Sequence, residues 1–141
     1  MLLAQFSNSA ILLMSIAAAA VLVYVPFMAV GFARLASGYD MNAPRAMFDQ
    51  LPGWGQRATW AHQNSWESFV LYAAAALMAD VSGTDATTIR WAALAYLVAR
   101  LLFSVFYIAN IAPLRSLMFA VGSVSIFILM SESIRAVLAA S

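Results

Sequence analysis

The stretch ILLMSIAAAAVLVYVPFMAVGFA, residues 11–33, carries no charge and is apolar except for Ser15. A helix of this length, at about 1.5 Å per residue, crosses a hydrocarbon core about 30 Å thick. No positively charged segment precedes it, and it is too long for the apolar core of a signal peptide, so we expect it to remain attached. The stretch therefore predicts a membrane-spanning helix, in which Pro26 is expected to cause a kink or to free a carbonyl near Leu22.

The composition of the whole chain indicates the same solvent. Of its 141 residues, 65% are hydrophobic and 9% are charged, whereas soluble domains average about a quarter charged. The net charge is +1 and the basic residues are not clustered, so no nucleic-acid partner is expected. The chain has no cysteine and one histidine, which leaves too few ligands for a metal site.

Three further apolar stretches follow the first, at residues 58–79, 91–110 and 116–135. A polar connection of 23 residues, 34–56, separates the first two, and short polar segments separate the others. No internal repeat is visible. The sequence predicts an all-α membrane protein with one four-helix domain over residues 1–141.

The arginines predict the orientation in the membrane. By the positive-inside rule, the loops richer in arginine face the cytoplasm. The first and third loops hold Arg34, Arg45, Arg57 and Arg115, against Arg90 and Arg135 on the other side. We therefore expect the first and third loops in the cytoplasm and both termini outside. The short loops favour a bacterial inner membrane.

Two charges fall at the same predicted depth. Glu67 lies about 14 Å into the second span and Arg100 about 15 Å above the same face in the third. An unpaired charge at mid-membrane costs about 2.5–3.5 kcal/mol, and pairing inside the bundle removes most of that cost. We expect contact between Glu67 and Arg100, within a protomer or across an interface.

Other polar groups share helical stripes with these charges. At about 100° per residue, the second span carries one stripe and the third another: Arg57, Ala61, Asn64, Glu67, Ser68 and Leu71; and Arg100, Phe103, Ser104 and Tyr107. Facing each other, the stripes would form a polar funnel open to the cytoplasm, for a ligand with an anionic end and a cationic group. The alternative is that these residues only provide hydrogen bonds between helices. His62 and Trp66 point the other way, and we expect a structural or interfacial role for His62.

Several motifs together resemble those of the MAPEG family, the membrane-associated proteins in eicosanoid and glutathione metabolism. They are R-A-x-x-A-H-x-N-x-x-E at 57–67, A-R-x-x-x-x-x-x-Y at 99–107, P-L-R-S at 113–116, G-F-A-R at 31–34 and N-A-P-R at 42–45. The resemblance extends over nearly the whole chain, including its size and the order of its spans.

The resemblance implies a homotrimer of four-helix protomers that binds glutathione between neighbouring subunits, near the cytoplasmic face. By position, the residues around glutathione would be Arg34, Asn64, Glu67, Arg100, Tyr107 and Arg115, with Arg57 joining them from the mouth of the funnel. Arg115 matches the arginine held to stabilise the thiolate, and Ser116 the serine proposed to assist it. A guanidinium suits this role because it favours the anion of a thiol whose pKa is about 8.5.

Three positions depart from characterised members, which carry arginine at Trp60, tyrosine at Ser68, and tyrosine or histidine at Phe103.

Three hypotheses for the function are therefore kept. The first is a glutathione-dependent transferase or peroxidase acting on a lipophilic electrophile or lipid hydroperoxide from the bilayer. The second is a non-catalytic member that binds small molecules or lipids, and the third is a purely structural bundle.

Overall fold

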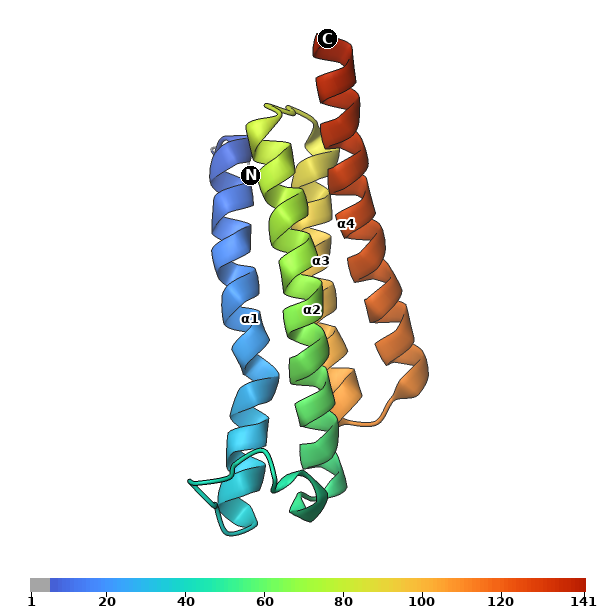
Figure 1. Cartoon of the computed structure of the whole chain (residues 1–141). Helices are drawn as coiled ribbons and strands as arrows, with labels where there is room; N and C mark the ends of the chain where they lie inside the picture. Colours follow the sequence, from blue (N-terminus) through green and yellow to red (C-terminus); the bar gives the residue numbers. More distant parts are fainter. Residues whose placement is uncertain (1–5) are drawn as a thin grey trace.

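The computed structural model describes residues 6–141, which form four long helices and one short 3-10 turn (Figure 1). The elements in chain order are α1 (Asn8–Ala36), η2 (Phe48–Gln50), α2 (Gly53–Val81), α3 (Thr87–Ile108) and α4 (Ala112–Ala140). No strand occurs in this part of the chain. The predicted all-α, four-helix architecture is confirmed.

The helices differ in length from the predicted spans. α1 and α2 extend into the segment that was expected to be loop, so the first connection shrinks to residues 37–52. The third connection is only residues 109–111, because α4 begins at Ala112 with a proline in its first turn, where a missing N–H costs nothing. Three arginines placed in loops by sequence lie in helices instead: Arg34, Arg57 and Arg115. Pro26 is buried inside a continuous α1.

Three of the helices, α1, α3 and α4, are long and apolar enough to cross a membrane. α2 matches α1 in length, at 29 residues, but carries Arg57, Asn64 and Glu67. Both α2 and α3 pack against all three other helices, and α2 lies between α1 and α4 in the view of Figure 1. That α2 also crosses the membrane stays a prediction.

Small side chains allow the helices to approach closely. Gly55 of α2 faces Ala33 of α1, and a Cβ added at Gly55 would lie 2.6 Å from the Ala33 Cβ. Further along α2 the buried positions include Ala58, Ala61 and Ala75. Interfaces of this kind are typical of membrane helices, where packing and hydrogen bonds replace the hydrophobic effect as the source of association.

A buried polar chain joins α1, α2 and α3. The Tyr72 and Tyr96 rings are stacked with centroids 3.7 Å apart and an interplanar angle of 4°. The Tyr72 hydroxyl lies 2.6 Å from that of Ser15, and the Tyr96 hydroxyl lies 3.1 Å from that of Ser68. Each tyrosine therefore has a hydrogen-bonding partner inside the bundle, as a buried hydroxyl requires.

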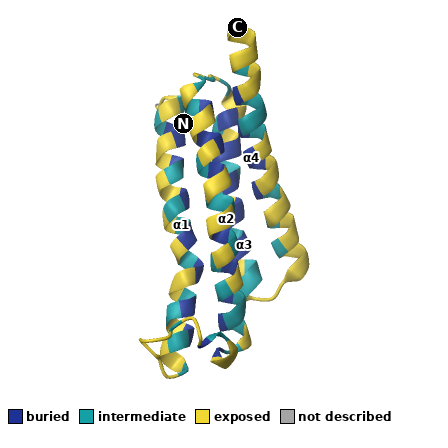
Figure 2. Cartoon of the chain, viewed as in Figure 1, coloured by how far each residue is buried: buried dark blue, intermediate teal, exposed yellow. Residues whose placement is uncertain are grey.

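α4 is less uniformly packed than the other helices. Its buried residues are Gly122, Ser125, Ile126, Leu129 and Ser133. No residue of its first part, 112–121, is buried (Figure 2). The end of α4 that follows α3 contacts α3 through side chains that stay partly or fully exposed, such as Arg115 on Tyr107 and Phe119 on Phe103.

Candidate functional site

Arg100 of α3 is the deepest of the candidate residues, and its side chain is 4% exposed. Its Nη2 donates to Asn64 Oδ1 at 3.1 Å and to Ser65 Oγ at 3.3 Å, both on α2. Its guanidinium also lies over the Phe103 ring, 4.2 Å from the centroid. All of these partners are neutral, so the protomer surrounds a buried positive charge with dipoles and a ring rather than with an anion.

The predicted contact between Glu67 and Arg100 is wrong within the protomer. Among residues 6–141 these two side chains form no ion pair, and the Glu67 carboxylate instead accepts from Asn64 Nδ2 at 3.4 Å. The reason is rotation about α2: Arg100 points between Asn64 and Ser65, while Glu67 lies on the far side of Asn64 by about 60°. Glu67 is exposed on the protomer surface. A contact across an interface stays a prediction.

At the other end of α3, Tyr107 and Arg115 come together. The Arg115 guanidinium lies 4.7 Å from the centre of the Tyr107 ring, and Tyr107 meets Phe103 edge-on at 5.3 Å. The tight turn between α3 and α4 makes this contact possible. Asn110 adopts a φ of 60° there, a left-handed conformation that asparagine tolerates better than most residues.

Arg57 reaches the same turn from α2. Its Nε donates to the Ile108 carbonyl at 3.0 Å, one of the acceptors left free at the end of a helix. Arg57 therefore fastens the start of α2 to the end of α3, beside Tyr107 and Arg115.

The structure thus brings six of the eight candidate residues to one face of the protomer, which we call the arginine face: Arg57, Asn64, Glu67, Arg100, Tyr107 and Arg115. Ser116 is exposed in the first turn of α4 and makes no hydrogen bond within residues 6–141. Arg34, in the last turns of α1, lies elsewhere and lines a pocket with residues of α2 and the 37–52 connection.

Each of the three departures from the family pattern has a place in this geometry. Ser68 is bonded to Tyr96 in the core rather than presented to a ligand. Phe103 stacks under Arg100. Trp60 is 43% exposed, with its ring 5.6 Å from that of Phe48.

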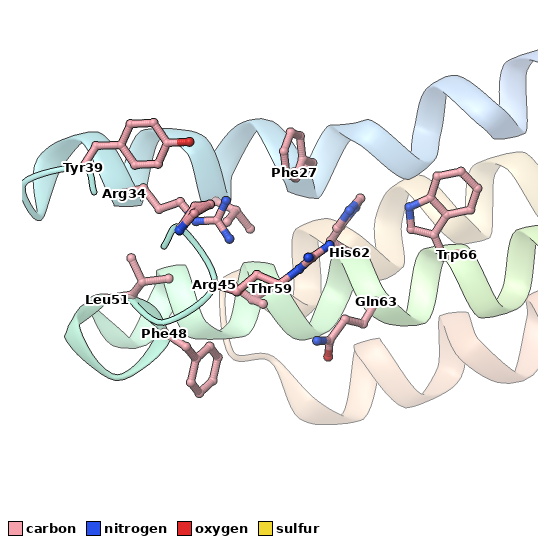
Figure 3. A pocket seen from close by; sticks show the side chains of 12 residues that line it. Phe27, Arg34, Tyr39, Arg45, Phe48, Leu51, Thr59, His62, Gln63 and Trp66 are labelled. Carbon is pink, nitrogen blue, oxygen red and sulfur yellow. The ribbon is translucent and has the colours of Figure 1, made fainter. Parts of the chain in front are cut away.

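A cavity of 730 Å³ that the sequence reasoning missed lies between α1, α2 and the 37–52 connection, and we call it the α1–α2 cavity (Figure 3). Its lining residues are Phe27, Val30, Arg34, Tyr39, Pro44, Arg45, Phe48, Leu51, Thr59, His62, Gln63 and Trp66. The Arg34 Nε is buried, and no group among residues 6–141 accepts a hydrogen bond from it. His62 Nδ1 donates to the Val23 carbonyl at 2.9 Å, which ties α2 to α1 as expected for a structural role.

A signal for this cavity is present in the sequence. Thr59, His62, Gln63 and Trp66 follow the spacing i, i+3, i+4, i+7, which puts them on one side of a helix. The predicted polar funnel used the opposite stripe of this helix, and Trp66 was assigned no role. Hydropathy and spacing also do not place Arg45, which reaches the cavity from the 37–52 connection.

The described residues contain no candidate metal site, because no three histidine, aspartate or glutamate side chains come together there. The polar groups of the arginine face can hold an organic anion and, at Glu67, a cation.

A model of one protein family, described as the MAPEG family, matches residues 11–135. The match includes most of each of the four helices, and it contains the residues of the arginine face and of the α1–α2 cavity. No curated protein and no solved structure matches the chain.

Proposed function

Since the chain belongs to the MAPEG family, we propose that it is a glutathione-dependent transferase or peroxidase acting on a lipophilic electrophile or a lipid hydroperoxide. It is an integral membrane protein, given the three apolar helices and the family. The observation that carries the proposal is the continuous line of contacts from Asn64 through Arg100, Phe103 and Tyr107 to Arg115.

This line offers the charges that glutathione needs. The tripeptide carries two carboxylates, an ammonium group and a thiol. Arg100 forms no ion pair with a carboxylate among residues 6–141 and suits a ligand carboxylate, because a buried guanidinium is stabilised by an opposite charge. Glu67 is exposed beside it and suits the ammonium group.

Arg115 is the residue that we assign to the thiol. It is half-buried and held against Tyr107 near the end of the bundle. A guanidinium beside a thiol favours the thiolate, which is the nucleophile, and arginine keeps its charge when partly desolvated. Ser116, the next residue of the same turn, is assigned to assist the reacting group.

We further propose a homotrimer. Glu67 lies at the midpoint of α2 and is exposed on the protomer surface, where contact with lipid would be costly. A neighbouring protomer or a ligand between protomers would cover it. Arg34 lies outside the arginine face of its own protomer. In this proposal Arg34 therefore contacts glutathione that is bound at the arginine face of a neighbouring protomer. The cytoplasmic placement of the 37–52 and 109–111 connections belongs to the same proposal.

A second candidate function is non-catalytic binding of a small molecule or lipid. The observation that favours it is Trp60, which lies exposed against Phe48 where characterised members carry an arginine. Phe103 also offers a ring and no hydroxyl. Binding of glutathione without conjugating or peroxidase activity over a panel of electrophiles and hydroperoxides would favour this function over the first.

Thermal stabilisation of the detergent-purified protein by millimolar glutathione is the first test. A specific site gives a shift that saturates and that shortened thiols do not reproduce. Thiolate absorbance of the complex should vanish in Arg115→Ala, with Arg135→Ala, an exposed arginine at the far end of α4, as the control. Unchanged turnover in Arg115→Ala would remove this residue from the mechanism, and absence of any saturable shift would contradict the proposal.

A further inference from the structure

Two arginines and no acidic residue line the α1–α2 cavity among residues 6–141. Arg34 from α1 and Arg45 from the connection both line it (Figure 3). No aspartate or glutamate of residues 6–141 is among the lining residues. The Arg34 Nε is buried and has no hydrogen-bonding partner in the described part of the chain, 6–141, and an unsatisfied buried donor is costly unless a ligand accepts from it. The cavity is therefore complementary to an anion.

The connection that presents Arg45 is ordered rather than loose. The Asp40 carboxylate accepts from the backbone nitrogens of Asn42 and Ala43, at 2.8 and 3.3 Å. Met47 and Leu51 are 2% and 5% exposed and anchor the segment to the bundle. The ordered connection thus presents Arg45 to the cavity, while the Asp40 carboxylate accepts hydrogen bonds from its own backbone and forms no ion pair with Arg45 among residues 6–141.

The remainder of the lining is largely apolar. Going from Arg34 back to Phe27 along α1 covers seven residues, or about 10 Å into the bundle. Phe27 and Trp66 lie at that deeper level, and both belong to an aromatic group that includes Tyr24 and His62. The cavity is cationic at the end of the bundle and aromatic at depth, which is the polarity of a membrane amphiphile.

We propose that the α1–α2 cavity binds an anionic amphiphile, with its carboxylate or phosphate head between Arg34 and Arg45 and its apolar chain beside Phe27 and Trp66. A volume of 730 Å³ lies within the range of small-molecule sites, about 300–1,000 Å³. Both head groups offer the same chemistry, an oxyanion that accepts from guanidinium N–H groups. The site is separate from the arginine face within the protomer and does not depend on thiol chemistry.

Trp66 provides a direct measurement, because a brominated chain bound in the cavity would quench its fluorescence. The protein in a neutral detergent is titrated with bromododecanoate, bromododecyl phosphate and uncharged bromododecanol. We expect saturable quenching by the two anions, and weaker, unsaturable quenching by the alcohol. The tighter of the two anions identifies the head group. Trp66→Phe should abolish the saturable part and leave the background of the other three tryptophans.

Arg34→Gln and Arg45→Gln test the clamp. Each should weaken the apparent affinity for the anions about tenfold, as loss of one charge-assisted hydrogen bond does, and leave the alcohol unaffected. Arg45 is exposed on a connection and Arg34 Nε has no partner, so neither change breaks a core contact. Arg135→Gln, at the far end of α4, is the matched control. Equal quenching by acid and alcohol, or unchanged affinity in both variants, would overturn the proposal.

Arg45→Gln separates this site from the proposed enzyme function, because Arg45, unlike Arg34, is not among the residues assigned to glutathione. Arg45→Gln should weaken the anionic probes while the glutathione-induced thermal shift stays as in the unmodified protein. Loss of the glutathione shift in this variant, with the probes unaffected, would assign the cavity to glutathione and refute the amphiphile site. Absence of a glutathione shift in every variant, with probe binding intact, would refute the enzyme function alone.

Discussion

Replacing Ser15 should destabilise the bundle more than replacing its partner Tyr72. The Ser15 hydroxyl donates to the Leu12 carbonyl at 2.7 Å. Its one proton is therefore used, and the Tyr72 hydroxyl, 2.6 Å away, is the donor in their contact. Tyr72 is fully buried, and among residues 6–141 its hydroxyl has no other hydrogen-bonding partner.

The magnitudes follow from which group loses its partner. In Ser15→Ala the buried Tyr72 hydroxyl is orphaned, which costs about 1–3 kcal/mol. In Tyr72→Phe, Ser15 keeps its bond to Leu12 and the ring keeps its stack on Tyr96. That loss should be near the average for one hydrogen bond between membrane helices, about 0.6 kcal/mol. The double variant leaves no orphaned hydroxyl and should cost less than Ser15→Ala alone.

The assay is reversible unfolding in mixed micelles as the fraction of sodium dodecyl sulfate rises, followed by far-ultraviolet circular dichroism at one protein concentration. Ser123→Ala is the control, because Ser123 is exposed and bonds only to a carbonyl of its own helix. A cost for Tyr72→Phe equal to or above that for Ser15→Ala would refute the reasoning. A double variant whose cost equals the sum of the single ones would refute it as well.

Three other changes test the packing and the arginine face. Gly55→Ala should lower the unfolding free energy by about 1–3 kcal/mol, because its Cβ would lie 2.6 Å from a Cβ of α1. The control Gly31→Ala meets open space and should be neutral or stabilising. Equal melting temperatures of the two variants would contradict this. Arg100→Met should keep the unfolding free energy within about 1 kcal/mol, since its partners are all neutral, but lose the glutathione-induced thermal shift; a retained shift would remove it from the site. Tyr107→Phe keeps the ring beneath the neighbouring arginine and should leave thiolate absorbance unchanged, while Tyr107→Leu should reduce it; equal absorbance in both would exclude a role for the ring.

The helices were predictable because a membrane-spanning helix requires a long, uninterrupted apolar stretch. Residues 11–33 alone indicated a membrane protein, and α1, α3 and α4 are long and apolar enough to cross a membrane. Their ends were not predictable from hydropathy, since amphiphilic residues such as Arg34 and Arg57 continue a helix as readily as they begin a loop. The turn at Asn110 that brings α4 close to α3 depends on backbone conformation, which hydropathy does not encode.

Depth was easier to infer than rotation. Counting residues placed Arg100 at the level of the polar part of α2 and so found the right neighbourhood. Which side chain of α2 it contacts depends on how each helix is turned about its axis, and a membrane helix that is apolar on every side gives little information on that. Asn64 and Ser65 therefore took the place predicted for Glu67. Arg45 escaped notice because its role depends on the folding of the connection over α2.

The two halves of α4 are packed differently. Its buried positions run from Gly122 to Ser133, whereas residues 112–121, here called the arm, include no buried residue. Gly122 is the pivot, since a Cβ there would lie 3.6 Å from the Cδ of Arg100. Displacing the arm would break the stacking of Arg115 on Tyr107, which resists it by about 0.5–2 kcal/mol. It would also break the ring contact between Phe119 and the buried Phe103. Because no residue of the arm is itself buried, this half of α4 is a part of the bundle whose displacement would disturb the packed core little.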